Sequence, residues 1–430
     1  MKHIKNIFSR KSSIWLALEL ILVTIACWWA FDPLLVTSYV THMPLGYDTD
    51  RLVQLNVASN IPVKEAFQNT NLFRDEETQL VEKLEEMEDV EMAYLAYDNP
   101  IGNGSMNLGH YFSTKLREDS IYAHVYGFMP DSKMFEVYGI QSLTPEVPTS
   151  ELSHDCEWEK SIIITRSLAM YLFGTIDVAG RTITSYTTFY NEKIWDYQKG
   201  NVDYKVRAVV EDIKSYISDR DYTNVFICKG SPSVNIPIIV RLREGINADK
   251  FIQSHQQQVD HELVTKHCYV RNMKSLKELN QQEFEHTYGR STRRFMLIAA
   301  FFALNLALGV FGTLLMYTRQ RREEAGVRRA FGATRWSVFW NFISEAWLLT
   351  TISVVAGCAI YFQFATTHGL FSHFLGTNSA SHYWFDDFGT HFLVVSVIVY
   401  LVLLCAVLIA TAIPAWRICR SEITVALKDE

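Results

Sequence analysis

The sequence lacks a phosphate-binding loop, since the pattern Gly-x4-Gly-Lys-Ser/Thr occurs nowhere in its 430 residues. This absence excludes ATP binding in the P-loop manner by this chain. No Gly-x-Ser-x-Gly motif occurs either, so the usual setting of a hydrolase nucleophile is missing. The polar part of the chain, residues 36–292, carries a net charge of about −12, which argues against a nucleic-acid partner. We therefore predict a protein without catalytic residues and without a bound cofactor.

Long apolar stretches, in contrast, occur four times. They cover residues 14–35, 295–317, 342–364 and 392–413. Each contains about the 20 residues that a helix needs to cross the apolar part of a bilayer. The first stretch follows a basic start, but it exceeds the apolar run of a signal peptide and no small-x-small cleavage site follows it. We expect it to be retained as a membrane anchor.

Basic residues are absent from the loop 365–391 but concentrated in three other segments. Segment 1–13 contains four Lys and Arg, segment 318–341 contains six, and the tail 414–430 contains three. Lys and Arg are enriched on the cytoplasmic side of membrane proteins, so we place these segments there and residues 36–294 outside. The expected protein crosses the membrane several times, contacts its lipid, and has both termini in the cytoplasm.

The outward segment 36–294 has the pattern of a mixed α and β domain. Helical patterns occur at 75–87, at 131–138 with Asp131 as the cap, and at 248–258. The stretch 276–294 either extends the second span as a stalk or breaks at Gly289. Runs rich in β-branched and aromatic residues predict strands at 52–57, 92–97, 121–128, 161–165, 204–210 and 236–242.

These patterns define the expected fold class. We predict an α-helical membrane protein with four transmembrane helices and a large α+β periplasmic domain of two lobes. This domain is inserted between the first and second helices.

Residue types that bind metals occur together in three segments. In each segment we favour ordinary polar structure over a metal site. Residues 154–157 (His-Asp-Cys-Glu) are adjacent, whereas real ligands are spaced so that they turn toward one point. In 261–267, His-Glu followed by a second His lacks the zinc-peptidase spacing. A pH sensor or metal site is conceivable at the outer loop, but a wet interfacial loop is favoured. The histidines in or beside that loop are His368, His373, His382 and His391. We predict no metal site.

Three of the seven cysteines lie in the segment predicted to face outward: Cys156, Cys228 and Cys268. An oxidising compartment would permit one disulfide among them and leave one thiol over. Three partly buried thiols are equally compatible with the sequence.

Polar residues within the predicted spans form a second group of candidates. Glu19 and Glu345 lie in the cytoplasmic halves of the first and third spans. A charged group in lipid costs about 3 kcal/mol or more, so such residues usually face protein or reach the interface. The two acids either share a polar contact, which Asn305 could join, or lie shallow enough to reach headgroups or the Arg cluster.

The segment between the second and third spans carries the sharpest pattern. Glu324 and Arg328 are spaced to support a helix. Gly332 then offers a helix stop, and Thr334 offers a fresh cap for the helix that enters the third span. A short amphipathic helix at this place either lies on anionic headgroups or docks into a soluble partner.

That segment resembles the signature of the FtsX-like permease domain in MacB-type ABC transporters, roughly Arg-x-x-Glu-Ile-Gly-x-x-Arg-Ala-x-Gly-Ala. It departs at Ala325, where a larger aliphatic residue is usual, and at Phe331, where Leu or Met is common. Residues 161–174, 179–181 and 204–214 resemble the periplasmic core of the same family. The matching residues are Arg321, Glu324, Gly326, Arg329, Ala330, Gly332 and Ala333.

The resemblance implies a permease subunit of the bacterial inner membrane that hydrolyses nothing itself. ATP and Mg would bind a separate ABC ATPase subunit, and this permease would pair as a homodimer or a related heterodimer. A periplasmic adaptor and an outer-membrane channel are further partners that the family suggests. The ATPase-coupling segment would be formed by Arg321, Glu324, Gly326, Arg329, Gly332 and Ala333.

The function implied is the export or efflux of an antimicrobial compound or peptide, driven by conformational change in the periplasmic domain. Two alternatives stay open: a mechanotransmitting regulator of a periplasmic hydrolase or sensor, and a lipoprotein-release permease. The substrate is not predicted.

Overall fold

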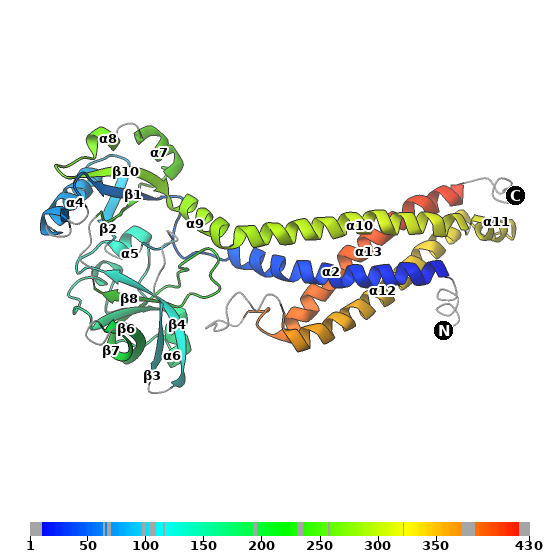
Figure 1. Cartoon of the computed structure of the whole chain (residues 1–430), viewed down its shortest axis with the longest axis horizontal. Coiled ribbons are helices and arrows are strands. Elements are labelled where there is room, and N and C mark those ends of the chain that lie inside the picture. Colours follow the sequence, from blue (N-terminus) through cyan, green and yellow to red (C-terminus); the bar gives the residue numbers. More distant parts are fainter. Residues whose placement is uncertain are drawn as a thin grey trace. The chain divides into compact units, whose positions relative to one another are not determined.

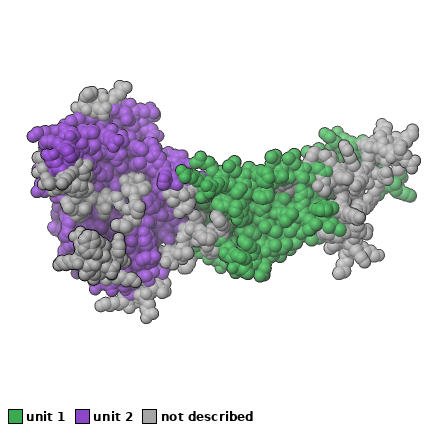
Figure 2. Space-filling model, in the orientation of Figure 1, with its two compact units in different colours: residues 1–39, 290–375, 382–430 green, residues 40–289, 376–381 purple. Residues whose placement is uncertain are grey.

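The structure is a computed structural model of the whole chain, which divides into two compact units (Figure 2). Unit 1 contains residues 1–39, 290–375 and 382–430, and unit 2 contains residues 40–289 and 376–381. The residues that the structure describes are 11–62, 65–66, 70–96, 100–102, 109–114, 117–191, 196–229, 235–256, 259–320, 322–370 and 383–420.

Unit 1 is built from long helices, and each predicted apolar stretch lies inside one of them (Figure 1). In the described part of the chain, three helices are long and apolar enough to cross a membrane: α2 from Ser13 to Thr41, α12 and α13. Helix α10, which contains the stretch 295–317, is 31 residues long. The bounds are α2 Lys11–Thr41, α10 Arg290–Gln320, α11 Arg322–Ala330, α12 Arg335–His368 and α13 Phe388–Arg420.

The core of unit 1 forms where α2 packs against α12 and α13. Trp28 is fully buried there, with its ring stacked on Tyr361 at 4.6 Å and on Phe392 at 4.8 Å between centroids. Gly357 permits the close approach of α2 and α12, since a Cβ at this position would lie 2.7 Å from Cβ of Thr24. Real Cβ atoms do not approach so closely, so the absence of a side chain brings these two helices together.

Unit 2 contains an antiparallel four-stranded sheet in the order β10-β1-β9-β2. One of its faces is aliphatic and packs against α4 and α7, with Phe73 and Phe251 fully buried. The opposite face is covered as well, because Tyr94 of β2 and Ile239 of β9 belong to a second buried cluster. The bounds are β1 Leu52–Ser59, α4 Thr70–Glu85, β2 Val90–Leu95, β9 Ile238–Leu242, α7 Ala248–His255, α8 Val259–Glu262, β10 Cys268–Ser275 and α9 Leu276–Phe284.

The other strands of unit 2 close into a barrel in the order β3-β4-β8-β5-β7-β6. The pairs β4–β8 and β5–β7 are parallel, and the run Ile162, Ile163 and Ile164 is buried on both faces of β5. A continuous apolar run of this kind is typical of a strand that is covered on both sides. The bounds are β3 Gly109–Thr114, β4 Arg117–Phe128, η1 Thr149–Glu151, β5 Ser161–Thr165, α6 Arg166–Phe173, β6 Thr182–Asn191, β7 Asp196–Val210 and β8 Asn224–Cys228.

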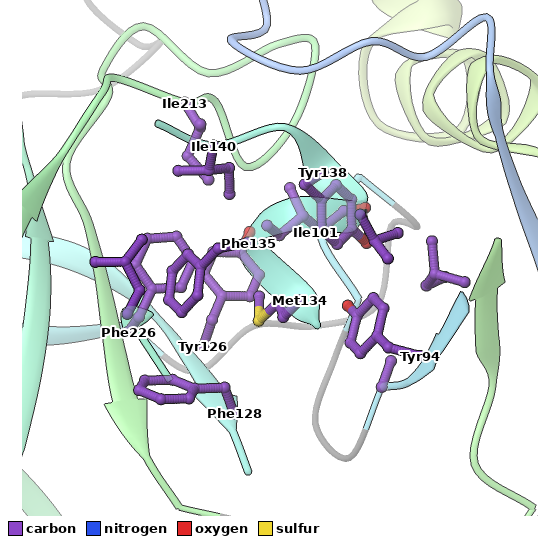
Figure 3. Close-up of a cluster of buried hydrophobic side chains, with 14 of the residues drawn as sticks. Tyr94, Ile101, Tyr126, Phe128, Met134, Phe135, Tyr138, Ile140, Ile213 and Phe226 are labelled. Carbon is purple, nitrogen blue, oxygen red and sulfur yellow. Dashed lines mark hydrogen bonds between the residues drawn. The ribbon is translucent and has the colours of Figure 1, made fainter. Parts of the chain in front are cut away.

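The short helix α5, Met134–Tyr138, joins the sheet to the barrel through a shared aromatic core (Figure 3). Phe135 meets Phe226 of the barrel at 5.2 Å between ring centroids, and Tyr138 meets Tyr94 of the sheet at 6.1 Å. Offset and edge-to-face aromatic pairs add about 0.5–1.5 kcal/mol each beyond the area that they bury. This common core explains why the sheet and the barrel form one compact unit.

The predicted strands are all confirmed, but the predicted cap of the helix at 131–138 is wrong. The helix begins at Met134, its N-cap is Lys133, and no side chain caps it. Asp131 instead has a φ of 59°, and its carboxylate lies 2.6 Å from Nδ1 of His154. The helical stretch 276–294 neither breaks at Gly289 nor continues as a regular α-helix. A π-helical turn at Glu285–Gly289 lies between α9 and α10.

Candidate functional site

The turn between α11 and α12 has the backbone geometry that the sequence predicts. Gly332 has a φ of 95°, a conformation that L side chains rarely adopt. Its N–H donates to the carbonyl of Arg329 at 3.1 Å, and the N–H of Ala333 donates to the carbonyl of Arg328 at 3.1 Å. These two bonds form a Schellman motif, which satisfies the last carbonyl groups of α11. The predicted stop is therefore confirmed.

The next helix is capped as expected. The side chain of Thr334 accepts a hydrogen bond from the N–H of Ser337 at 3.2 Å. Beneath the turn, Ala325 is buried in a small core with Val338 and Phe342 of α12 and Ala415 of α13. Its small size therefore suits packing inside this chain. The turn is held by a cap on each side and a core below it, so it is a rigid projection of unit 1.

Phe331 lies at the tip of this projection and is 90% exposed. Val327, one turn earlier on α11, is also exposed, and Arg328 lies beside it on the exposed surface. Exposed large apolar side chains next to basic residues are typical of a surface that binds a partner. The sequence reasoning noted Phe331 as a departure from the family pattern but did not select it as a site residue.

The structure describes four of the predicted coupling residues fully, one in part and one not at all. Arg321 lies outside the described residues, and Glu324 is described only as part of the α11 backbone. Gly326 is buried, while Arg329 and Ala333 are half-buried. The structure thus places Gly326, Arg329, Gly332 and Ala333 on one short helix and its closing turn.

Two of the three polar residues of the predicted spans, Glu19 and Asn305, lie at α10. Glu19 of α2 lies against Gly309, because a Cβ at that glycine would be 1.9 Å from the Glu19 carboxylate. Asn305, one turn earlier in α10, donates to the carbonyl of Phe301 in its own helix at 2.9 Å. Glu345 is half-buried on α12. The structure therefore brings Glu19 to the same stretch of α10 as Asn305.

A second polar pair in unit 1 was missed by the sequence reasoning. Asp32 of α2 and His391 of α13 lie 2.7 Å apart, from Oδ1 to Nε2, and neither side chain is exposed. The ring of Trp384 stacks on His391 at 5.2 Å. The interpretation of His391 as part of a wet interfacial loop is wrong, because α13 begins at Phe388 and buries this histidine against α2. An acid within an apolar stretch was the available signal.

His267, another candidate histidine, has a structural partner. Nδ1 of His267 lies 2.7 Å from Oε1 of Glu76, whose other oxygen accepts the N–H of His267 at 2.7 Å. Burial alone would raise the pKa of Glu76, but the hydrogen bonds from Thr265 and His267 lower the pKa of this carboxyl below its usual value. His373 and His382 lie outside the described residues. Among those described, no three His, Cys, Asp or Glu residues are placed to hold a metal.

Together, the apolar helices and the large α+β unit define a membrane protein. Residues 296–423, which include the α11–α12 turn, match the model of the FtsX-like permease C-terminal family. The macrolide export ATP-binding/permease protein MacB of Marinobacter nauticus is 34% identical over 91 residues, which cover 21% of this chain and 14% of that protein. MacB of Nitrosomonas europaea is 36% identical over 73 residues, covering 16% and 11%.

Two solved structures align with about half of the chain. The periplasmic region of MacB from Actinobacillus actinomycetemcomitans is 13% identical, with a TM-score of 0.29, and the alignment covers 57% of this chain and 97% of that one. The extracellular domain of the ABC-type transporter YknZ from Gram-positive bacteria is 12% identical, with a TM-score of 0.28 and coverages of 51% and 100%. The family match and the two MacB relatives confirm the predicted resemblance: the chain is similar to FtsX/MacB-type ABC transporter permeases.

Proposed function

We propose that this chain couples ATP hydrolysis by a separate ABC ATPase subunit to a conformational change in unit 2. The observation that carries the proposal is the α11–α12 turn, a capped and internally packed projection with Phe331 exposed at its tip. A rigid projection transmits force because its ends cannot unwind when a partner moves against it. The FtsX-like family match covers this turn, which supports its assignment as the coupling contact.

In the proposed topology, α2, α10, α12 and α13 are the four spans, and the turn lies in the cytoplasm. Unit 2 is then periplasmic, which is consistent with the absence of Lys and Arg from residues 365–391. A cysteine introduced at Thr377 is expected to react with an impermeant maleimide added outside, and one introduced at Ser337 is expected to stay unlabelled. Both are made in a background without native cysteines. The reverse pattern would overturn the orientation.

The names of the relatives support a proposal for the cargo class. Both MacB proteins are named for macrolide export, and we propose export of an antimicrobial compound or peptide by a dimer of this permease with its ATPase. The chain contains no P-loop, whereas those relatives are named as ATP-binding/permease proteins. ATP binding must therefore be supplied by another polypeptide or segment.

The test uses the permease co-expressed with a candidate ABC ATPase subunit. Phe331→Ser removes the exposed apolar tip, and we expect about a tenfold or greater loss of ATPase association, as at a central interface residue. Met170→Ser, which alters an apolar residue of α6 in unit 2 that is 48% exposed, is the control. Glu324→Ala combined with Arg329→Ala should also uncouple the ATPase. If co-purification and stimulated ATP turnover both survive these changes, the coupling assignment is wrong.

A further inference from the structure

Two of the three cysteines in unit 2 lie together at one end of the barrel. Cys228 is the last residue of β8 and is fully buried, while Cys156 lies in the loop after η1 and is half-buried. The Sγ of Cys228 contacts the carbonyl oxygen of Cys156 at 3.7 Å. Both side chains pack in the aromatic core that joins barrel and sheet. A thiol that reaches the backbone of another cysteine is compatible with the Cα separation of about 4.4–6.8 Å seen in disulfides.

The loop that carries Cys156 is held firmly in this position. The N–H of Glu159 donates to the carbonyl of Cys228 at 2.9 Å, and Arg207 of β7 donates to the carbonyl of Glu151 at 2.9 Å. Asp155 and Glu159 both have positive φ, at 47° and 53°. Such backbone conformations persist only where the surroundings impose them. The two cysteines are thus brought together by the fold before any bond forms between them.

Cys268, the third candidate, is separated from this pair by its surroundings. It begins β10 and is fully buried in the core of the sheet, a different cluster from the one around α5. Its N–H donates to the Glu76 carboxylate at 3.2 Å. The fold therefore selects one of the pairings that the sequence left open, and Cys268 is the thiol left over.

We propose that Cys156 and Cys228 form a disulfide when unit 2 faces an oxidising compartment. The compartment follows from the proposed topology. The bond itself depends on the arrangement of residues within unit 2, and it requires neither the ATPase partner nor the export function.

The chemistry requires an oxidant, which we take to be a disulfide-bearing oxidoreductase of that compartment. The Cys156 thiolate attacks one sulfur of the oxidant's disulfide and releases the other sulfur as a thiolate. The Cys228 thiolate then attacks the sulfur of Cys156. This step forms the bond between the two cysteines and releases the oxidant's remaining sulfur as a thiolate. The two cysteines lose two electrons and two protons, and the oxidant's disulfide becomes a dithiol.

The order of attack follows from exposure and charge. Burial raises the pKa of Cys228 to about 12, which disfavours its thiolate in the reduced protein. Burial also raises the pKa of Cys156, but the nearby Arg207 opposes this increase, and the side chain is partly accessible. Cys156 is therefore the thiol that meets the oxidant, and Cys228 resolves the mixed disulfide from within the core.

The experiment counts oxidised cysteines in the full-length chain. Membranes are treated with N-ethylmaleimide under denaturing conditions, then reduced, and the newly released thiols are labelled with a maleimide–polyethylene glycol. We expect two labels on the wild-type chain, none on Cys156→Ser, and two on Cys268→Ser, the matched control. Peptide mapping without reduction should recover residues 156 and 228 in one cross-linked species.

A wild-type chain with no labels, or a cross-linked peptide that contains Cys268, would overturn the proposal. A stability measurement separates a formed bond from a variant that misfolds. Adding a reductant should lower the unfolding temperature of the purified wild-type protein by several degrees, because a cross-link restricts the unfolded chain. The same reductant should leave the unfolding temperature of Cys156→Ser unchanged. Equal responses of the two proteins would contradict the proposed bond.

Discussion

The buried pair between Asp32 and His391 provides a demanding test of how unit 1 is held together. Both side chains have no exposed surface, and the two atoms in contact lie 2.7 Å apart. His391→Ala would leave the Asp32 carboxylate in the same apolar surroundings without the imidazole. Removing one partner of a buried pair typically costs about 3–5 kcal/mol, because the remaining group keeps its desolvation penalty. We expect a loss of this size in the free energy of unfolding.

Two further variants distinguish the free-energy cost of breaking the pair from an ordinary loss of packing. Ser396→Ala removes the acceptor of the 3.0 Å hydrogen bond from Nε1 of Trp28, a neutral contact in the same core. We expect a cost of about 0.5–1.5 kcal/mol for this control. Asp32→Ala combined with His391→Ala removes both members of the pair, so its cost should be smaller than the sum of the two single changes by about 1–3 kcal/mol.

The assay is unfolding of the purified protein in mixed micelles with an increasing fraction of denaturing detergent. Circular dichroism follows the helices, and the fluorescence of the ten tryptophans follows tertiary packing. Two of these tryptophans lie near the pair, since Trp384 stacks on His391 and Trp28 lies 6.1 Å from it, centroid to centroid. The reasoning fails if His391→Ala costs no more than Ser396→Ala, or if the two single changes simply add in the double variant.

Three further predictions concern other parts of the chain. Gly357→Ala places a Cβ against α2 and should lower the free energy of unfolding in mixed micelles by about 1–3 kcal/mol. Gly312→Ala is the control, because nothing lies within 4 Å of its added Cβ, and it should not have this effect. Equal effects of the two changes would refute the helix contact. Thr334→Ala removes the cap of α12 and should cost about 0.5–2 kcal/mol in the same assay, and an unchanged midpoint would contradict the cap. Burial raises the pKa of Asp219 from 3.8 to about 7, so the folded protein holds a proton that the unfolded chain releases, and stability falls as pH rises between these values. The unfolding temperature of Asp219→Asn should therefore fall less than that of the wild type between about pH 5 and pH 8, and an equal fall would show that Asp219 does not contribute.

Local chemistry explains why much of the architecture was predictable. The apolar stretches, the strands and the stop at Gly332 depend on side chains that are near one another in the sequence, and hydrogen bonds within a helix or turn follow from them. The strand at 161–165 is an example, since three successive isoleucines already indicate burial on both faces. The prediction of Asp131 as a helix cap was wrong because the Asp131 carboxylate instead contacts His154, a residue 23 positions away in the chain.

The candidate site was predicted less completely. The sequence marks the segment that contains Gly332 and Ala333, because their spacing is a backbone requirement. It does not reveal that Ala325 faces the interior of the chain and that Phe331 is exposed, because both assignments depend on where α12 and α13 pack against α11.

By itself, the sequence determined that this is a membrane protein with a large acidic α+β segment, a capped turn between apolar helices and no P-loop. Only the tertiary structure decided that Asp32 meets His391 across 359 residues of chain, and that Cys228 lies beside Cys156 while Cys268 lies elsewhere. The physical reason is the same in each case. Helix and strand patterns arise from neighbours along the chain, whereas the partner of a buried polar group or thiol is set by which elements pack together, and packing is decided by the whole core at once.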